Sequence, residues 1–244
     1  MEVTFIGSGD AFGSGGRFNT CFLFAGARCR LLIDCGASSL VALKQRGIDP
    51  NDLDGVVVSH LHGDHFGGLP FLLLDAQHLS RRRRNLFLWG PAGLAARLAS
   101  TREALFPGST ETTLRFPLSY REIEAGERAV GEGFAVTPFP AAHAAGAPCF
   151  ALRLEIDGRI LAYSGDTAWT EALVAAARGA DLFICECSSY ARRQSGHLDY
   201  DALAPRLAQI GAKRVILTHM NPDMLEARGG IAHETAEDGL TITL

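Results

Sequence analysis

Four side chains that can bind a metal ion lie within the segment GVVVSHLHGDHFGG, residues 55–68: His60, His62, Asp64 and His65. The apolar run before them predicts a short buried strand that ends near Ser59. Residues two apart on an extended chain point to the same side, so His60 and His62 are expected to face one ion, and Asp64 and His65 a second ion. Imidazole and carboxylate ligands suit zinc, manganese or iron. The alternative, histidines on a polar surface loop, explains less well why four side chains that can bind metal lie within six positions.

Further residues of the same types follow other apolar segments. His143 comes after FAVTPFP, Asp166 lies in LAYSGDT, and His219 ends RVILTH. An aspartate in this position can bridge two cations, because each carboxylate oxygen can bind one. Taken singly, Asp166 would be a helix N-cap and His143 a loop residue. The position that all three share, at the end of a strand, favours metal binding.

Strands and helices are predicted along most of the chain. Their order indicates mixed sheets with helices on the outside, which is an α/β or α+β class. The DGR sequence predicts a hairpin turn near residue 158. With 244 residues, of which 47% are hydrophobic, one domain covering residues 1–244 is expected. The expected strands are 2–7, 21–26, 29–36, 55–60, 85–90, 134–140, 149–156, 159–165, 181–187, 214–219 and 239–244, and the expected helices are 38–47, 66–79, 91–106, 168–179 and 199–211.

Composition limits the classes of partner. The 23 basic and 27 acidic residues leave a net charge of −4, which gives no electrostatic reason for binding nucleic acid or an anionic membrane. No stretch approaches the roughly 18 apolar residues of a membrane span, and no signal peptide is evident, so a cytoplasmic protein is expected. The six cysteines are expected to be mostly reduced core residues. The basic run Arg81–Arg84 suggests either a remnant of nucleic-acid binding or a solvated helix end, and the second is favoured.

The pattern HLHGDH, then His143, SGDT and a late LTH resembles the metallo-β-lactamase superfamily of hydrolases over nearly the whole chain. The resemblance implies a four-layer αβ/βα sandwich of two mixed β-sheets, with helices on the outer faces and two divalent metal ions along one edge. Zinc is expected ahead of manganese or iron. The resemblance further implies that His60, His62 and His143 hold one ion, that Asp64, His65 and His219 hold the other, and that Asp166 bridges them.

Two segments are similar to the ribonuclease Z and phosphodiesterase branch: FIGSGDAFGSGGRFNTCFLF and ECSSYARRQSGHLDYDALA. The resemblance implies that His197 touches the scissile phosphate, although a capping or solvent role is the structural alternative. Glu186 could orient His197 or a metal ligand, or could be a buried strand residue with a backbone partner. In the glycine-rich first loop, Ser8 and Gly9 are candidates for binding substrate phosphate through backbone amides.

The chain departs from ribonuclease Z between His143 and Asp166. Only 22 residues intervene, and one hairpin uses almost all of them, so the arm that grips tRNA is absent. We therefore expect a phosphodiesterase that uses a metal-activated hydroxide on a small or cyclic phosphodiester or nucleotide. His197, a metal-bound water or Asp64 could protonate the leaving alkoxide.

Three other functions stay open from the sequence. They are a lactonase or thioesterase type of carbonyl hydrolase, a ribonuclease Z-like tRNA 3′ endonuclease, and a metal-binding protein without activity. A nucleic-acid substrate is not favoured, no membrane partner is expected, and a homodimer is expected by analogy with the branch.

Overall fold

The computed structural model describes all 244 residues, and its centre is a pair of seven-stranded mixed sheets packed face to face. In the first sheet, β14, β1, β2 and β3 are antiparallel, and β3, β4, β5 and β6 are parallel. Its strands, in the order β14-β1-β2-β3-β4-β5-β6, are β1 (Glu2–Gly7), β2 (Cys21–Ala25), β3 (Arg30–Ile33), β4 (Gly55–Val57), β5 (Leu86–Gly90), β6 (Leu118–Glu122) and β14 (Thr241–Thr243).

The second sheet has the order β13-β12-β11-β10-β9-β8-β7. Strands β7 to β10 are antiparallel, and β10 to β13 are parallel. These strands are β7 (Ala129–Gly131), β8 (Phe134–Pro140), β9 (Phe150–Ile156), β10 (Arg159–Tyr163), β11 (Leu182–Glu186), β12 (Val215–Thr218) and β13 (Glu234–Thr235). Because β10, β11 and β12 are parallel, the residues that follow them lie at the same edge of this sheet.

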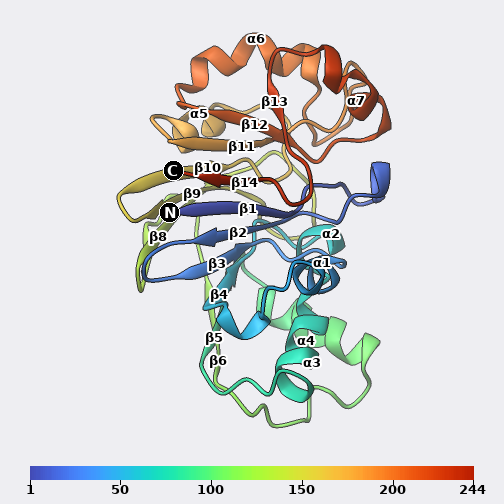
Figure 1. The fold of residues 1–244 in the computed structure, drawn as a ribbon, viewed down its shortest axis with the longest axis vertical. Coiled ribbons are helices and arrows are strands. Elements are labelled where there is room, and N and C mark those ends of the chain that lie inside the picture. The colour runs from blue at the N-terminus through green and yellow to red at the C-terminus, as the bar shows by residue number, and fades with distance from the viewer.

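Helices cover the outer face of each sheet. Figure 1 shows α5, α6 and α7 beside the second sheet, and α1, α3 and α4 on the side of the first. The helices are α1 (Ser39–Gln45), α2 (Gly63–Phe66), α3 (Leu69–His78), α4 (Leu94–Leu105), α5 (Glu171–Ala177), α6 (Tyr200–Ile210) and α7 (Pro222–Ala227). The four-layer αβ/βα sandwich predicted from the sequence is confirmed.

The core has three layers, one between the sheets and one between each sheet and its helices. In β3, Leu31 and Ile33 pack between the two sheets, whereas Leu32 packs against the helices. Across the sheets, the rings of Phe22 and Tyr163 meet edge to face with centroids 5.1 Å apart. A strand covered on both faces needs apolar residues at every position, which explains why these strands are continuous apolar runs.

The helix predicted over residues 66–79 is two helices. Helix α2 ends at Phe66, α3 begins at Leu69, and Gly67 and Gly68 lie between them. A Cβ atom on Gly68 would lie 2.2 Å from the carbonyl oxygen of Gly36, so only glycine lets the chain pass here. Four short elements that were not predicted are also present: β6, β7, β13 and α7.

The prediction of a solvated helix end at Arg81–Arg84 is wrong for Arg82. Helix α3 already ends at His78, and the side chain of Arg82 is buried. Its guanidinium group donates to the carbonyl oxygens of Leu53 and Asn85, each at 2.6 Å, and to that of Pro50 at 3.2 Å. Arg82 therefore ties together the segments that lead into β4 and β5.

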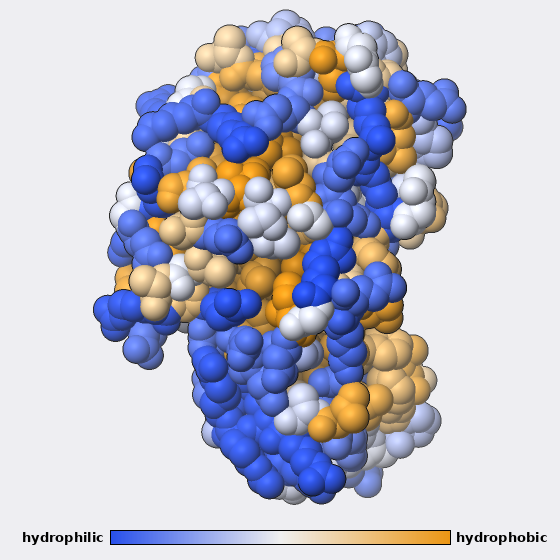
Figure 2. All heavy atoms as spheres, in the orientation of Figure 1, coloured by the Kyte–Doolittle hydropathy of each residue, from blue (hydrophilic) through white to orange (hydrophobic).

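Arg84 is exposed and forms an ion pair with Asp54. Figure 2 shows a mainly hydrophilic surface low in the view, where Figure 1 places β5 and β6.

Two local predictions are confirmed. All six cysteines are buried and free. The hairpin between β9 and β10 turns at Asp157 and Gly158, whose φ angles of 51° and 73° are those of a tight hairpin turn. No helix in the structure has the length and apolar character needed to cross a membrane.

Candidate metal centre

The seven residues predicted to bind metal come together in two groups, and within each group the ligand atoms lie within 4.8 Å of one another. Asp166 belongs to both groups. The residues come from α2 and from the loops that follow β4, β8, β10 and β12. The first group is His60, His62, His143 and Asp166, and the second is Asp64, His65, Asp166 and His219.

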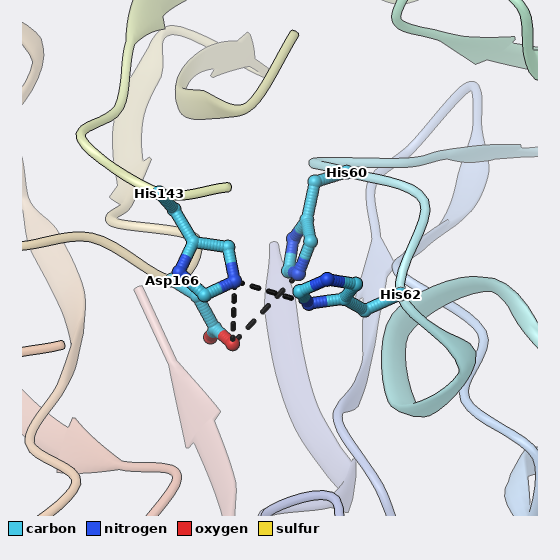
Figure 3. Close-up of side chains that lie close together, drawn as sticks. All are labelled: His60, His62, His143 and Asp166. Atoms are coloured by element: carbon cyan, nitrogen blue, oxygen red, sulfur yellow. Dashed lines mark hydrogen bonds and ion pairs between the residues drawn. The ribbon is translucent and has the colours of Figure 1, made fainter. Parts of the chain in front are cut away.

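In the first group, three imidazole rings lie together and the carboxylate of Asp166 lies beside them (Figure 3). The Oδ2 atom of Asp166 lies 3.7 Å from Nε2 of His60 and 4.0 Å from Nε2 of His143. Nδ1 of His62 lies 3.0 Å from Nε2 of His143. The ring nitrogens therefore converge on one small volume from three directions.

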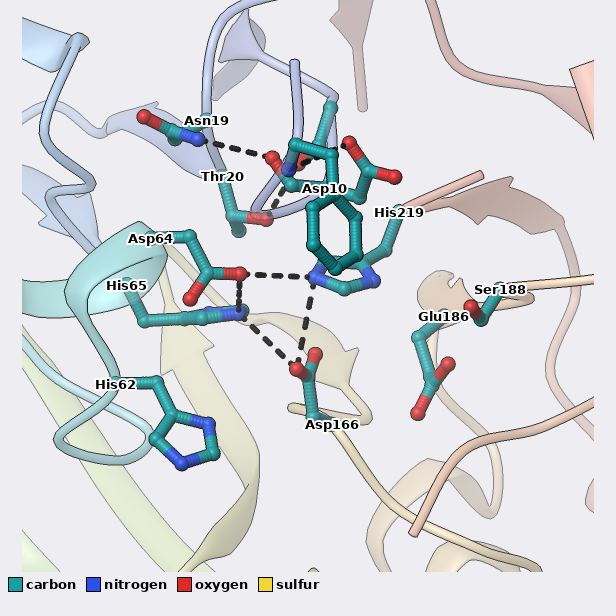
Figure 4. A network of polar contacts seen from close by, with 12 residues as sticks. Asp10, Asn19, Thr20, His62, Asp64, His65, Asp166, Glu186, Ser188 and His219 are labelled. Carbon is teal, nitrogen blue, oxygen red and sulfur yellow. Dashed lines mark hydrogen bonds and ion pairs between the residues drawn. The ribbon is translucent and has the colours of Figure 1, made fainter. Parts of the chain in front are cut away.

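In the second group, two carboxylates and two imidazoles alternate (Figure 4). Oδ2 of Asp64 lies 3.2 Å from Nε2 of both His65 and His219. Oδ2 of Asp166 lies 3.3 Å and 3.5 Å from the same two nitrogens. One oxygen of Asp166 thus faces both groups.

Several of these polar atoms are buried without a hydrogen-bond partner: Nε2 of His60, Nε2 of His65 and Oδ1 of Asp166. A buried polar atom without a partner costs about 1–3 kcal/mol, so this many at one place indicates that a ligand belongs there. Nitrogen and carboxylate oxygen are the donors that zinc, manganese and iron accept. The residues present therefore fit two divalent metal ions.

The charges within the centre shift the pKa values of its members in opposite directions. Burial lowers the pKa of His219, but the carboxylates of Asp166 and Asp64 outweigh burial and raise it to about 9. Burial would raise the pKa of Asp64, yet His65 and His219 hold it well below its usual range. For His60, burial is the main effect and lowers the pKa. Two anionic carboxylates at the centre favour the binding of cations.

A residue that the sequence analysis missed, Asp34, connects the two groups. Its buried carboxylate accepts hydrogen bonds from the backbone N–H of Ser59 at 2.7 Å and from the Ser59 hydroxyl at 2.8 Å. Oδ2 of Asp34 also lies 2.7 Å from Nδ1 of His65, and the Ser59 hydroxyl lies 3.1 Å from Nδ1 of His60. With Nδ1 engaged, Nε2 of both rings is left to face the centre.

The sequence held a signal for Asp34. In LLIDCG it follows an apolar strand directly, and Asp166 follows its own strand after two residues in LAYSGD. Its backbone, like that of His219, adopts a left-handed conformation with φ of 59°. Non-glycine residues rarely do so, and such strain concentrates at functional sites.

His197, the candidate phosphate-contacting residue, lies at the rim of the centre. Its side chain is 20% exposed, and its Nδ1 atom lies 3.2 Å from Oε1 of the fully buried Glu186. The His197 ring meets that of His143 edge to face at 4.9 Å and stacks on that of His219 at 5.7 Å. His197 therefore touches one member of each group.

Glu186 makes both of the contacts considered for it, one with a backbone partner and one with His197. Its Oε1 atom accepts a hydrogen bond from the backbone N–H of Thr167 at 2.7 Å and also pairs with His197. Burial raises the pKa of Glu186, and the hydrogen bond from His197 opposes that shift. The carboxylate thus joins His197 to the loop that carries Asp166.

The loop before His197 also fixes a candidate ligand. The carbonyl oxygen of Gly196 lies 2.9 Å from Nδ1 of His143, which leaves Nε2 of that ring for a metal. A Cβ atom on Gly196 would lie 2.8 Å from the same nitrogen, so this close approach requires glycine. Residues of the two loops line a hollow of about 320 Å³, open beside the centre: Ala142, His143, Ala144, Ser195 and Gly196.

Ser8 and Gly9 lie beside the centre but do not form the predicted cradle of free amides. The N–H of Ser8 donates to Asp238 at 2.8 Å, and the N–H of Gly9 donates to the carbonyl oxygen of Phe18 at 2.7 Å. The carbonyl oxygen of Ser8 accepts from the backbone N–H of His219 at 3.1 Å. In this arrangement Ser8 supports His219, and the amides of both Ser8 and Gly9 are already satisfied.

Comparisons with known proteins agree with this geometry. Ribonuclease Z from Bacillus velezensis is 27% identical over 280 residues, which cover 91% of this chain and 88% of that protein. Anti-Pycsar protein Apyc1 from Bacillus phage 010DV004 is 27% identical over 243 residues, which cover 92% of this chain and 90% of that protein.

Solved structures show the same fold. Human tRNase Z, short form, has a TM-score of 0.80 and 25% identity, covering 100% of this chain and 99% of that chain. The metallo-β-lactamase fold protein YhfI from Bacillus subtilis has a TM-score of 0.78 and 22% identity, covering 99% of both chains.

These similarities confirm the resemblance to the ribonuclease Z and phosphodiesterase branch of the metallo-β-lactamase superfamily. The family described as Anti-Pycsar protein Apyc1 matches residues 1–238. With its two-group His and Asp cluster, the chain is a metal-dependent hydrolase and belongs to the Anti-Pycsar protein Apyc1 family.

Proposed function

We propose that this protein is a phosphodiesterase that hydrolyses a small or cyclic phosphodiester of a nucleotide. The observation that carries the proposal is His197, a partly exposed imidazole that is held by Glu186 and touches one member of each ligand group. A phosphoryl group undergoing hydrolysis spreads negative charge over its oxygens, and a fixed donor beside the metals stabilises that charge.

In this proposal two divalent ions, with zinc preferred, are held by the two groups. His60, His62 and His143 would hold one ion and Asp64, His65 and His219 the other, with Asp166 shared by the two groups. When bound, such ions act as Lewis acids and lower the pKa of water toward about 7. The chain contributes the geometry: Asp34 and Ser59 orient His60 and His65, and Gly196 orients His143.

His197 is proposed to donate to a phosphoryl oxygen through Nε2, because its Nδ1 atom is engaged by Glu186. The same atom is the better candidate to protonate the leaving alkoxide. Asp64, another candidate from the sequence, has its carboxylate turned inward between His65 and His219. We infer that Asp64 binds metal and that His197 acts on the substrate.

The size of the substrate is inferred from the segment between His143 and Asp166. After the short loop at residues 144–149, this segment consists of β9, a tight turn and β10, all of it within the second sheet. It therefore offers no protruding arm for a folded RNA. The names ribonuclease Z and tRNase Z among the relatives support phosphodiester chemistry, and the missing arm favours a smaller substrate than theirs.

We also infer that residues 1–244 work as a single hydrolase domain, since each group draws ligands from segments that follow strands of both sheets.

The test is turnover of a panel by purified protein of known metal content. The panel contains an aryl phosphodiester, 2′,3′- and 3′,5′-cyclic nucleotides, a precursor tRNA, a lactone and a thioester. Turnover confined to the aryl and cyclic phosphodiesters is expected. Turnover of only the lactone or the thioester would contradict the proposal, and cleavage of only the precursor tRNA would contradict the small substrate.

A further inference from the structure

The most exposed large apolar side chain of the protein is Phe12, at 89%. Its backbone is nonetheless firmly held. The buried carboxylate of Asp10 accepts hydrogen bonds from the N–H of Phe12 at 3.1 Å, the N–H of Ser14 at 2.9 Å and the Ser14 hydroxyl at 2.7 Å. The loop over residues 10–16 therefore presents an aromatic ring to solvent from a fixed backbone.

This loop lies at the rim of the second ligand group. The carbonyl oxygen of Asp10 accepts from the side chain of Asn19 at 2.9 Å. Asn19 in turn packs on Gly36. A Cβ atom added to Gly36 would lie 2.4 Å from the Cβ of Asn19 and 2.1 Å from the carbonyl oxygen of Asp64, so Gly36 touches both residues. Figure 4 shows Asp10 and Asn19 on the same side of the centre as Asp64 and His219.

The other end of the loop is braced by α7. A Cβ atom on Gly15 would lie 3.0 Å from Cδ1 of Leu225, so the turn at residues 14–16 lies against that helix. Two residues span at most about 7 Å, so Phe12 stays close to Asp10 and to the rim. The backbone of Phe12 is thus fixed next to Asp10, and its ring is open to solvent.

We propose that Phe12 is a specificity-determining residue that stacks on the base of a nucleotide substrate. This inference rests on the proposed function, because it requires a phosphodiester at the metal centre. In a cyclic nucleotide one ribose ring separates the base from the phosphate, so with the phosphate at the metal centre the base would extend outward toward the rim. Base–aromatic stacking tolerates different bases, so Phe12 would favour substrates that carry any base over substrates that carry none.

The test compares two substrates: a purine 3′,5′-cyclic nucleotide and the methyl riboside 3′,5′-cyclic phosphate, which has the same cyclic ester and no base. The ratio of kcat/KM for the first to that for the second is measured in the wild type and in two variants. In Phe12→Ala the ratio is expected to fall about tenfold, the loss of one stacking contact. Phe12→Tyr keeps an aromatic ring and is expected to keep the ratio within about twofold.

The matched control is Leu79→Ala. Leu79 is 70% exposed and lies just after α3, so its removal takes away an exposed apolar side chain outside the proposed site. The ratio of the two kcat/KM values in Leu79→Ala is expected to equal that of the wild type.

An unchanged ratio in Phe12→Ala would overturn the inference, whether kcat/KM stays the same for both substrates or falls equally for both. A change in oligomeric state of Phe12→Ala by light scattering would also overturn it, since the ring would then contact a second copy of the chain. If the wild type cleaves neither substrate nor an aryl phosphodiester, the proposed function itself fails. If the wild type cleaves both and only the ratio test fails, the role of Phe12 alone is refuted.

Discussion

Asp34 and His65 form a carboxylate–imidazole pair in the interior, with Oδ2 of Asp34 2.7 Å from Nδ1 of His65. Neither side chain reaches solvent. Through Ser59 the same carboxylate also reaches His60, so one residue outside the ligand set orients a member of each group.

Replacing Asp34 should therefore weaken metal binding without removing a ligand. In Asp34→Asn, affinity for zinc or manganese is expected to fall about 10- to 100-fold, measured by competition with a chromogenic chelator. Asp75→Asn is the control, since Asp75 is also a buried carboxylate but pairs with Lys44 on α1 instead. Wild-type affinity in a folded Asp34→Asn protein would contradict the orienting role.

Asp166 is shared by both groups, so its loss should affect both ions. Asp166→Ala is expected to retain far less metal than the wild type after gel filtration, as measured by elemental analysis. His78→Ala removes an exposed histidine of α3 and should keep the full wild-type content. Full occupancy in Asp166→Ala would rule out a bridging carboxylate.

His197 should matter for turnover and not for metal content. In His197→Ala we expect kcat for a phosphodiester to fall about 10²-fold or more, with the metal content unchanged. Glu186→Gln, which keeps the shape of the residue that holds His197, should give a smaller loss of kcat. The proposed role does not survive if His197→Ala retains wild-type turnover of an aryl phosphodiester.

Arg82 should contribute to stability alone. Arg82→Ala leaves buried carbonyl groups without their donor, and the free energy of unfolding is expected to fall by about 3 kcal/mol or more in urea titrations. The neighbouring Arg83 is exposed, and Arg83→Ala should change that free energy by less than about 0.5 kcal/mol. Equal stabilities of the two variants would show that the buried guanidinium group has no structural role.

The strong signals in the sequence came from residues that end apolar strands. His60, His143, Asp166 and His219 stood out as candidates because each lies within a few residues of the end of a mainly apolar strand, and such strands place the residues that follow them at a sheet edge. The part played by Asp34 could not be assigned, because it depends on hydrogen bonds to Ser59 and His65 that only the folded chain brings together.

Other features left no pattern to detect. Strand β6 is an edge strand whose residues are mostly exposed, so it lacks an apolar run, and β13 has only two residues. Arg82 lies in a run of four arginines and is distinguished from its neighbours only by where the chain turns. Their charge favoured solvent exposure for all four arginines, whereas carbonyl groups from two loops enclose the guanidinium group of Arg82.

Each ligand group takes residues from the first 65 positions and from beyond position 142. A growing chain on the ribosome therefore carries half of each set long before the other half has been made. Neither set is complete until Asp166 has emerged, and the second must wait for His219. The centre can form only after both sheets have supplied their ligand-bearing segments, so a chain cut short before His219 would lack a complete second group.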